Sequence, residues 1–108
     1  MKLRYAPAAL DDLRRIRDYI RDELAQPVSA ERIPAGIVRR CARLATTPLL
    51  GPPLQPRVRR KTDLRVLTCR SHVVFYRVEN TTVSVIRILH VRQDFVAALE
   101  IGGKEKRP

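Results

Sequence analysis

Five polar side chains interrupt the apolar segments in the C-terminal half of the chain, and they are the first candidates for chemistry: Arg65, Tyr76, Arg77, Arg87 and His90. An arginine between apolar strand neighbours must reach solvent in a groove or meet an acid or a carbonyl, because an unpaired buried charge is very unfavourable. For Arg87, Asp94 and Glu79 are the candidate acids. A histidine at a strand end, such as His90, is more often an orienting hydrogen-bond group than a catalyst.

Other kinds of reactive site are not indicated by the sequence. The four glycines form no phosphate-binding loop, and no serine stands in a nucleophile motif. His72 and His90 lie far apart with no further ligand at metal-binding spacing, and the two cysteines, Cys41 and Cys69, are too few for a disulfide framework. We therefore expect neither a metal nor a cofactor. A small-molecule enzyme is not favoured.

The charge of the chain is strongly positive, since 22 Lys and Arg residues face 11 Asp and Glu residues and give a formal net charge of +11. The excess is concentrated in the middle of the chain, where only Asp63 opposes six basic residues: Arg57, Arg59, Arg60, Lys61, Arg65 and Arg70. Such a surface is typical of a protein with an anionic partner, either a nucleic acid or an acidic protein. A simpler explanation of the positive charge is that it only keeps the protein soluble.

The N-terminal part predicts a short strand over residues 2–5 and then an amphipathic helix from Pro7 to about Ala25. Its predicted apolar stripe recurs at helical spacing and consists of Leu10, Leu13, Ile16, Ile20 and Leu24. The opposite face offers the ion pairs Asp11–Arg15 and Arg14–Asp18 at i,i+4. The apolar runs are too short to span a membrane and the N-terminus lacks a signal region, so we expect a reduced, cytoplasmic protein.

A second helix is predicted after Gln26-Pro27, with Ser29 as its N-cap and Thr47-Pro48 as its end. Its apolar stripe consists of Ala30, Ile33, Ile37, Cys41 and Leu44. Pro34 leaves open whether the helix begins properly only at that residue, because proline lacks the N–H that an interior position uses. The two helices form a helical hairpin.

Residues 48–62 predict an extended, exposed loop, and the rest of the chain predicts a three-strand meander over residues 64–68, 72–78 and 82–91. Asp94 caps a final short helix over residues 95–101, and residues 102–108 form a frayed charged tail. The chain is therefore expected to be one α+β domain over residues 1–108. In its core, apolar residues of the two helices should pack on residues of the sheet. The helix residues are Leu13, Ile16, Ile20, Ile33, Ile37 and Leu44, and the sheet residues are Val74, Tyr76, Ile86 and Ile88.

Four motifs of the chain resemble the RelE/ParE toxins of type II toxin–antitoxin modules. The segment YAPAALDDL, at residues 5–13, is similar to their opening, and TPLLG at 47–51 to the turn after their second helix. LRVL at 64–67 and HVVFYRV at 72–78 resemble their central hairpin. VIRILHVRQD at 85–94 is similar to the closing motif of ParE-like members. The fold that this resemblance implies is a strand and a two-helix hairpin packed on a small antiparallel sheet, with a short C-terminal helix.

The resemblance implies different activities for the two branches of the family. RelE-like members cut mRNA on the ribosome with basic residues on the sheet and a C-terminal tyrosine. The matching positions here carry side chains that do not ionise: Leu64, Val66, Val73, Gln93 and Leu99. At these positions the chain is therefore more similar to ParE-like members, which inhibit DNA gyrase by protein contact. Two alternatives stay open: an mRNA endonuclease that uses Arg65, Arg87 and His90, and an inactive relative or plain nucleic-acid-binding module.

The resemblance also implies partners: an acidic antitoxin that is partly disordered until bound, and DNA gyrase, or the ribosome and its mRNA, as the target. A plasmid-stabilisation role, a homodimer and a toxin–antitoxin hetero-oligomer are all compatible with it. The expected target- or antitoxin-binding residues are Arg57, Arg59, Arg60, Lys61, Arg65, Arg77, Arg87, His90, Arg92, Gln93 and Asp94.

Overall fold

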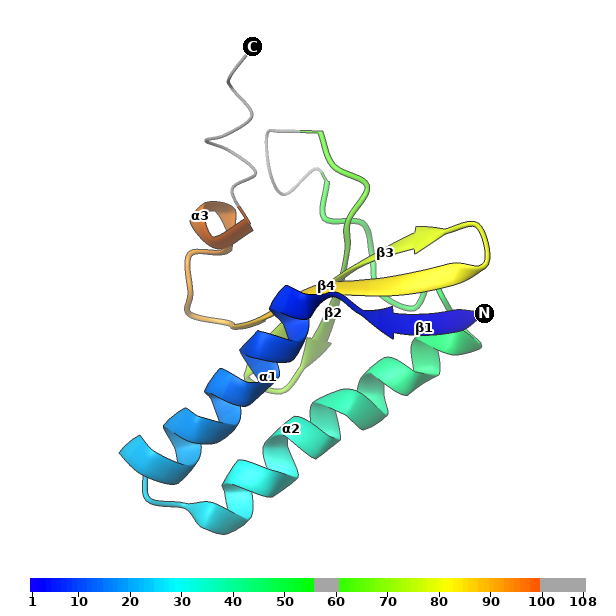
Figure 1. The fold of residues 1–108 in the computed structure, drawn as a ribbon. Coiled ribbons are helices and arrows are strands. Elements are labelled where there is room, and N and C mark those ends of the chain that lie inside the picture. The colour runs from blue at the N-terminus through cyan, green and yellow to red at the C-terminus, as the bar shows by residue number, and fades with distance from the viewer. Residues whose placement is uncertain (56–60, 100–108) are drawn as a thin grey trace.

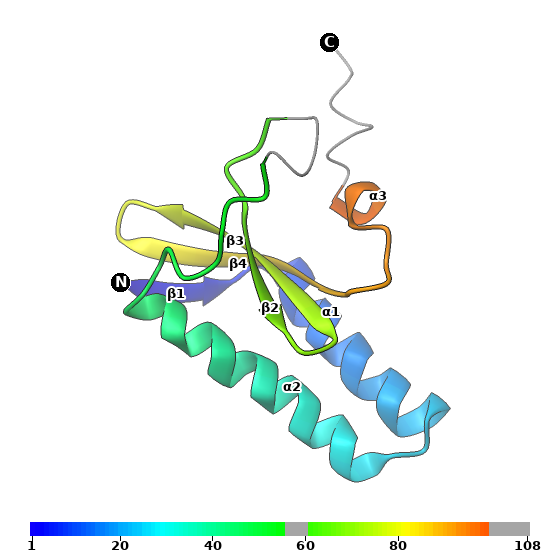
Figure 2. The same ribbon diagram turned by 180° about the vertical axis from the view of Figure 1, so that it is seen from behind.

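A computed structural model describes residues 1–55 and 61–99 of the chain. A four-stranded sheet is covered on one face by a long helical hairpin, and a short helix lies near the other face (Figures 1 and 2). The elements in chain order are β1 (Lys2–Tyr5), α1 (Pro7–Asp18), the π-helical turn η1 (Tyr19–Glu23), α2 (Pro27–Ala42), the 3-10 turn η2 (Arg43–Ala45), β2 (Arg65–Cys69), β3 (His72–Glu79), β4 (Thr82–His90) and α3 (Phe95–Leu99). The α+β class is confirmed.

The sheet has the strand order β1-β4-β3-β2. β2, β3 and β4 form the predicted antiparallel meander, whose bounds differ from the predicted ones by about a residue. β1 adds to β4 in parallel, from Lys2↔Thr82 to Tyr5↔Val85, so the sheet is antiparallel except at this edge. The pairing with β1 ends at Val85. The last part of β4 therefore needs another partner for its backbone.

The first helix begins at Pro7, as predicted, because proline fits the first helical position. Its buried face, however, holds Ala9, Asp12 and Ile20, and Leu10 and Leu24 are exposed. The predicted stripe is wrong at both ends. At the C-terminal end the reason is η1, where the Leu24 N–H donates to the Tyr19 carbonyl oxygen at 3.2 Å. This turn contains one residue more than an α-helical turn, which rotates Leu24 away from the line of Ile20.

The second helix begins at Pro27, and Pro34 lies inside it. The prediction of Ser29 as N-cap and the option of a start at Pro34 are therefore both wrong. Pro27 occupies the first helical position, where its missing N–H costs nothing. The helix turns its predicted apolar side to the sheet except at Ile33, which is exposed.

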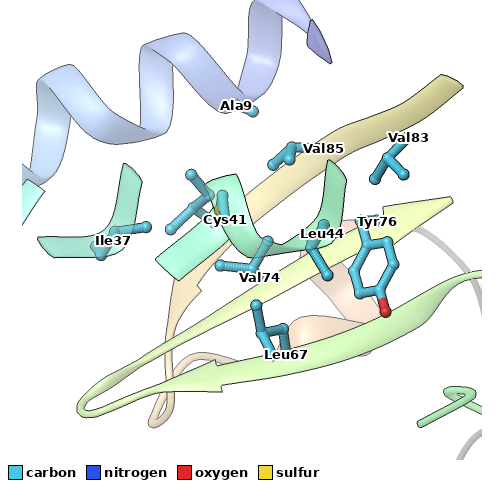
Figure 3. Close-up of a cluster of buried hydrophobic side chains, with 10 residues drawn as sticks. Ala9, Ile37, Cys41, Leu44, Leu67, Val74, Tyr76, Val83 and Val85 are labelled. Carbon is cyan, nitrogen blue, oxygen red and sulfur yellow. The ribbon is translucent and has the colours of Figure 1, made fainter. Parts of the chain in front are cut away.

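The main core lies between the helical hairpin and the sheet (Figure 3). Its buried members are Ala9, Ile37, Cys41, Leu44, Leu67, Val74, Tyr76, Val83, Val85 and Ile88. The prediction that Ile86 belongs to this core is wrong. Tyr76 pairs with Val85 and Phe75 with Arg87, so Ile86 is an extra residue in a β-bulge. A bulge reverses the alternation of side chains, and Ile86 packs on the opposite face.

A second, smaller cluster lies on that opposite face. Leu54, Leu64, Val66, Phe75 and Leu89 are buried in it, and Phe95, Val96, Ala98 and Leu99 of α3 pack against it. Residues 52–54 run along β2, where the Leu54 N–H donates to the Leu64 carbonyl and the Val66 N–H to the Pro52 carbonyl. The predicted exposed loop is thus anchored at its start. Residues 56–60 of that loop, residues 100–101 of the predicted final helix and the predicted tail at 102–108 lie outside the described residues.

Candidate functional site

Asp12 and Arg87 form an ion pair at the junction of α1, β4 and α3. The Arg87 Nε donates to Asp12 Oδ2 at 2.7 Å and Arg87 Nη2 donates to Asp12 Oδ1 at 2.9 Å. A further guanidinium nitrogen donates to the Ala98 carbonyl oxygen of α3 at 3.1 Å. The hydrogen bonds to Asp12 raise the pKa of the Arg87 guanidinium, which is therefore permanently charged. Arg87 thus joins three elements of the fold.

Asp12 also accepts a backbone hydrogen bond from the part of β4 that lies beyond its pairing with β1. Its side chain is only 5% exposed, and its Oδ2 accepts the Ile88 backbone N–H at 2.8 Å. A carboxylate at this position satisfies both a buried backbone donor and a partly buried cation, which would be costly if left unpaired. Neither predicted acid, Asp94 nor Glu79, is the partner, although the predicted carbonyl contact exists. The available signal was the position of Asp12 on the inner side of α1, three residues after Ala9 and four before Ile16.

Tyr76 and Arg65 hold the turn at residues 48–51. The Tyr76 O–H donates to the Pro48 carbonyl at 2.8 Å, and the Gly51 N–H donates to the Tyr76 oxygen at 2.9 Å. The Arg65 Nε donates to the Gly51 carbonyl at 2.7 Å. A Cβ on Gly51 would lie 2.1 Å from the Val66 carbonyl oxygen, so only glycine fits. This contact set explains the TPLLG segment, and it gives Arg65 a structural role.

The residues after β4 shape the connection to α3. The His90 N–H donates to Gln93 Oε1 at 3.0 Å, and the Arg92 N–H donates to His90 Nδ1 at 3.1 Å. Asp94 Oδ1 accepts the Ala97 N–H at 3.3 Å, as expected of the residue that caps the final helix. His90 therefore acts here as an orienting hydrogen-bond group, and Arg92 is exposed at the surface of the turn.

The remaining candidates lie elsewhere. Arg77 contacts both oxygens of Asp63, at 2.9 and 3.0 Å, on an exposed part of the sheet. Lys61 is exposed, and Arg57, Arg59 and Arg60 lie outside the described residues. The three residues considered for catalysis are not brought together: Arg65 bonds to Gly51, Arg87 to Asp12 and Ala98, and His90 to its own turn. The contacts of these three residues hold parts of the fold together and do not form one reactive site.

The two long helices differ in charge. On α1 and η1 the arginines pair with neighbouring acids, as in Arg14–Asp11 at 3.5 Å and Arg21–Asp18 at 3.1 Å. These pairs are spaced i,i+3, so the predicted i,i+4 pairs are wrong. Arg32 and Arg39 of α2 and Arg43 of η2 are exposed, and within the described residues no carboxylate pairs with them. These arginines give α2 and η2 an excess of unpaired positive charge within the described residues.

Two further classes of site find no support within residues 1–55 and 61–99. These residues include no group of three His, Cys, Asp or Glu side chains arranged to hold a metal ion. None of their helices has the length and apolar character that crossing a membrane requires.

Comparisons with known proteins agree with the fold. Among solved structures, a chain of the chromosomal ParDE toxin–antitoxin system from P. aeruginosa is similar over 83% of this chain and 95% of its own, with a TM-score of 0.70 and 22% identity. A chain of the RelBE2 toxin–antitoxin complex from Mycobacterium tuberculosis is similar over 82% of this chain and 95% of its own, with a TM-score of 0.60 and 24% identity. No curated protein matches.

The sequence itself gives the family. The family described as "ParE toxin of type II toxin-antitoxin system, parDE" matches residues 3–95, which include both long helices, β2, β3 and β4, and β1 except for Lys2. The expected resemblance to RelE/ParE toxins is confirmed, and the chain belongs to the ParE toxin family of type II toxin–antitoxin systems.

Proposed function

We propose that this toxin inhibits DNA gyrase by protein contact and is neutralised by an acidic antitoxin. The proposal is supported most by the sheet face that α3 covers. In RelE-like nucleases the resemblance implies basic residues at the positions of Leu64, Val66 and Val73. Here Leu64 and Val66 are buried in the apolar cluster under α3, and Val73 packs against it.

RNA cleavage needs a base, a cation for the phosphorane and an acid for the leaving oxygen. The other two positions that the resemblance assigns to this chemistry do not supply them. Gln93 uses its side-chain oxygen to accept the His90 N–H, and Leu99 packs on the apolar cluster. The alternative set of Arg65, Arg87 and His90 is dispersed and bound to other parts of the fold. Docking therefore fits this surface better than catalysis.

The contacts with gyrase are proposed to involve the exposed turn after β4, with His90 and Arg92, and the adjoining α3. Arg87 supports this region through its bond to the Ala98 carbonyl. Gln93 and Asp94 fix the turn by their backbone contacts. We assign the antitoxin to the basic residues, where charge accelerates association with an acidic segment: Arg57, Arg59, Arg60, Lys61, Arg65 and Arg77, together with the α2 arginines.

Purified protein tests the two activities directly. Added to a supercoiling reaction, it should inhibit gyrase, and added to a coupled translation reaction it should leave ribosome-bound mRNA whole. Arg92→Ala should weaken gyrase inhibition by about 1–3 kcal/mol of binding free energy, as expected for one anchor of a docking surface. Shortened mRNA that becomes intact on His90→Ala substitution would instead establish the nuclease.

A further inference from the structure

We propose that Arg70, together with Arg92, binds carboxylate side chains of an acidic segment of the protein that the toxin inhibits. Arg70 stands in the two-residue turn between β2 and β3, and Arg92 stands in the connection from β4 to α3. Both lie at the end of the sheet opposite to the turn between β3 and β4 (Figures 1 and 2). The inference rests on the proposed function, which assigns the connection after β4 to the target.

The backbone of Arg70 has an unfavourable conformation. Its φ is 55°, in the left-handed region, where the Cβ lies too close to the following carbonyl oxygen. The first residue of the equivalent turn between β3 and β4 is Asn80, with a φ of 48°. Asparagine tolerates this region better than most residues that have a Cβ. The same sheet thus uses the favoured residue in one turn and an arginine in the other, which indicates that the arginine side chain has a function.

The two arginines belong to chain segments that are bonded to each other. The antiparallel ladder of β3 and β4 continues past its last pair, because the Val91 N–H donates to the Ser71 carbonyl oxygen at 2.9 Å. The next residue along this register is Arg70 on one segment and Arg92 on the other. Like charges at facing positions of two strands are destabilising. The stability of the fold therefore explains neither the conformation of Arg70 nor its position beside a second arginine.

This end of the sheet has an excess of positive charge. Arg70 and Arg92 are exposed, and no carboxylate in residues 1–55 and 61–99 forms an ion pair with either. Arg40 of α2 adds a third guanidinium, because its Nε donates to the carbonyl oxygen of Thr68, near the end of β2, at 3.2 Å. The one acid of the two connecting segments, Asp94, accepts a backbone N–H of α3. Three arginines thus face one carboxylate that is already in use.

Carboxylates of a protein are the anions that fit this arrangement. A guanidinium binds a carboxylate through two parallel hydrogen bonds, and a small group of arginines is enough for a few acidic side chains. A nucleic acid is less suited, because its affinity comes from many successive phosphates. The acidic antitoxin is assigned to other basic residues, whereas Arg92 lies in the region assigned to the target. Complementary charge would also direct the two proteins toward this orientation.

Gyrase supercoiling tests the inference with Arg70→Asn, made in the full chain. This variant gives the turn the residue type that Asn80 provides in the other turn, so its melting temperature should rise. Half-inhibition should nevertheless need about tenfold more protein. Arg14→Gln is the matched control, because it removes one exposed positive charge from α1, and it should inhibit like the wild type. An Arg70→Asn variant as inhibitory as the control would overturn the inference.

Reversing the charge separates binding from any change in the fold. Arg70→Glu should need about a hundredfold more protein for half-inhibition, because it places a carboxylate against the acidic segment of the target. Arg70→Glu as inhibitory as Arg70→Asn would overturn the inference, since the partner would then not be acidic. A short DNA duplex tests the other polyanion. Binding of the duplex at physiological salt that Arg70→Asn abolishes would also overturn the inference, and a duplex that binds both proteins equally or not at all supports a protein partner.

Growth arrest in cells separates the inference from the proposed function. If the purified wild type does not inhibit gyrase, the proposed function fails, but the role of Arg70 can still be tested on the unknown target. Loss of arrest in Arg70→Asn, with Arg14→Gln still toxic, then supports the inference. Retained arrest in Arg70→Asn overturns it.

Discussion

The two faces of the sheet are covered in different ways. The hairpin face carries a continuous core to which both long helices and all four strands contribute side chains. The opposite face carries a smaller cluster under α3, a helix of five residues, and under the segment around Leu54. The first arrangement provides most of the apolar burial that stabilises the fold. The smaller cluster mainly covers the sheet face on which the resemblance places the charged groups of RelE-like nucleases.

This difference teaches that the two faces make different demands on the sequence. The hairpin face needs apolar side chains from both long helices and from the strands. The α3 face needs them only over a small area, and Leu64, Val66 and Val73 make that area apolar. The Asp12–Arg87 pair connects the two sides, from α1 to the Ala98 carbonyl in α3.

The largest effect is expected at this connection. Asp12→Ala should lower the free energy of unfolding by about 3–5 kcal/mol, because it leaves the Arg87 charge and the Ile88 N–H without their acceptor. Asp12→Asn is the matched control and should cost less, since its side-chain oxygen still accepts a hydrogen bond. Urea unfolding measures both. A cost below about 1 kcal/mol for Asp12→Ala would mean that the pair does not couple the two faces.

Two isoleucines of β4 compare the faces directly. Ile88 is buried in the hairpin-face core and Ile86 is only partly buried on the α3 face. Ile88→Ala should cost about 3 kcal/mol of unfolding free energy, and Ile86→Ala about 1 kcal/mol, because a partly exposed site leaves less cavity. Both residues lie in one strand and lose the same atoms. Equal costs in urea unfolding would contradict the distinction between the faces.

A smaller effect is expected where the loop at 48–51 meets the hairpin-face core. Tyr76→Phe removes one hydroxyl and leaves the Pro48 carbonyl and the Gly51 N–H without that partner. The substitution should cost about 1–3 kcal/mol of unfolding free energy. Amide exchange at Gly51 should also become faster. If the exchange rate of Gly51 is unchanged, the hydroxyl does not anchor the turn.

The smallest effect is a dependence on pH at the end of the hairpin face. His72 is buried and its ring meets that of His90 edge to face, with centroids 5.3 Å apart. Burial, and then the charge of His90, lowers the pKa of His72 below the 6.5 of the unfolded chain. Its contribution to stability is therefore present above about pH 6.5 and is lost as the pH falls through the lower pKa of the folded state.

The measurement compares urea midpoints at pH 7.5, 6.5 and 5.5. The decline from this residue is at most about 1.4 kcal/mol per pH unit, and His72→Gln should remove it. His90→Gln is the control and should retain most of the decline, because burial is the larger cause of the shift. A His72→Gln profile as steep as the wild type would assign the decline to other groups.

The order of elements and the bounds of the strands could be predicted from the sequence. Periods of two and of about 3.6 residues, with proline at the first helical position, are local signals, and β1, α1 and the meander follow them. Two of the errors arose where a local feature of the backbone altered the period. The π turn at Tyr19–Glu23 rotates Leu24 outward, and the bulge at Ile86 places its side chain on the opposite face of the sheet.

The candidate site was less predictable, because its residues were found but not their partners. Arg65, Arg87 and His90 stand out as polar groups among apolar strands, and each is used in the structure. Their acceptors, however, lie 14 residues away for Arg65 and 75 for Arg87. Asp12 resembles the other acids of an exposed helix face until α1 is placed against β4. Pair assignments of this kind depend on packing.

The sequence by itself determined the class of fold, the family, the positive charge and the non-ionising residues at the positions of the nuclease groups, since each depends on residue type and spacing along the chain. Only the tertiary structure decided that Arg87 is bound by Asp12, that Ile86 lies on the α3 face, and that Leu24 is exposed. The physical reason is that burial and ion pairing depend on which elements meet, and elements meet through contacts between residues far apart in the chain.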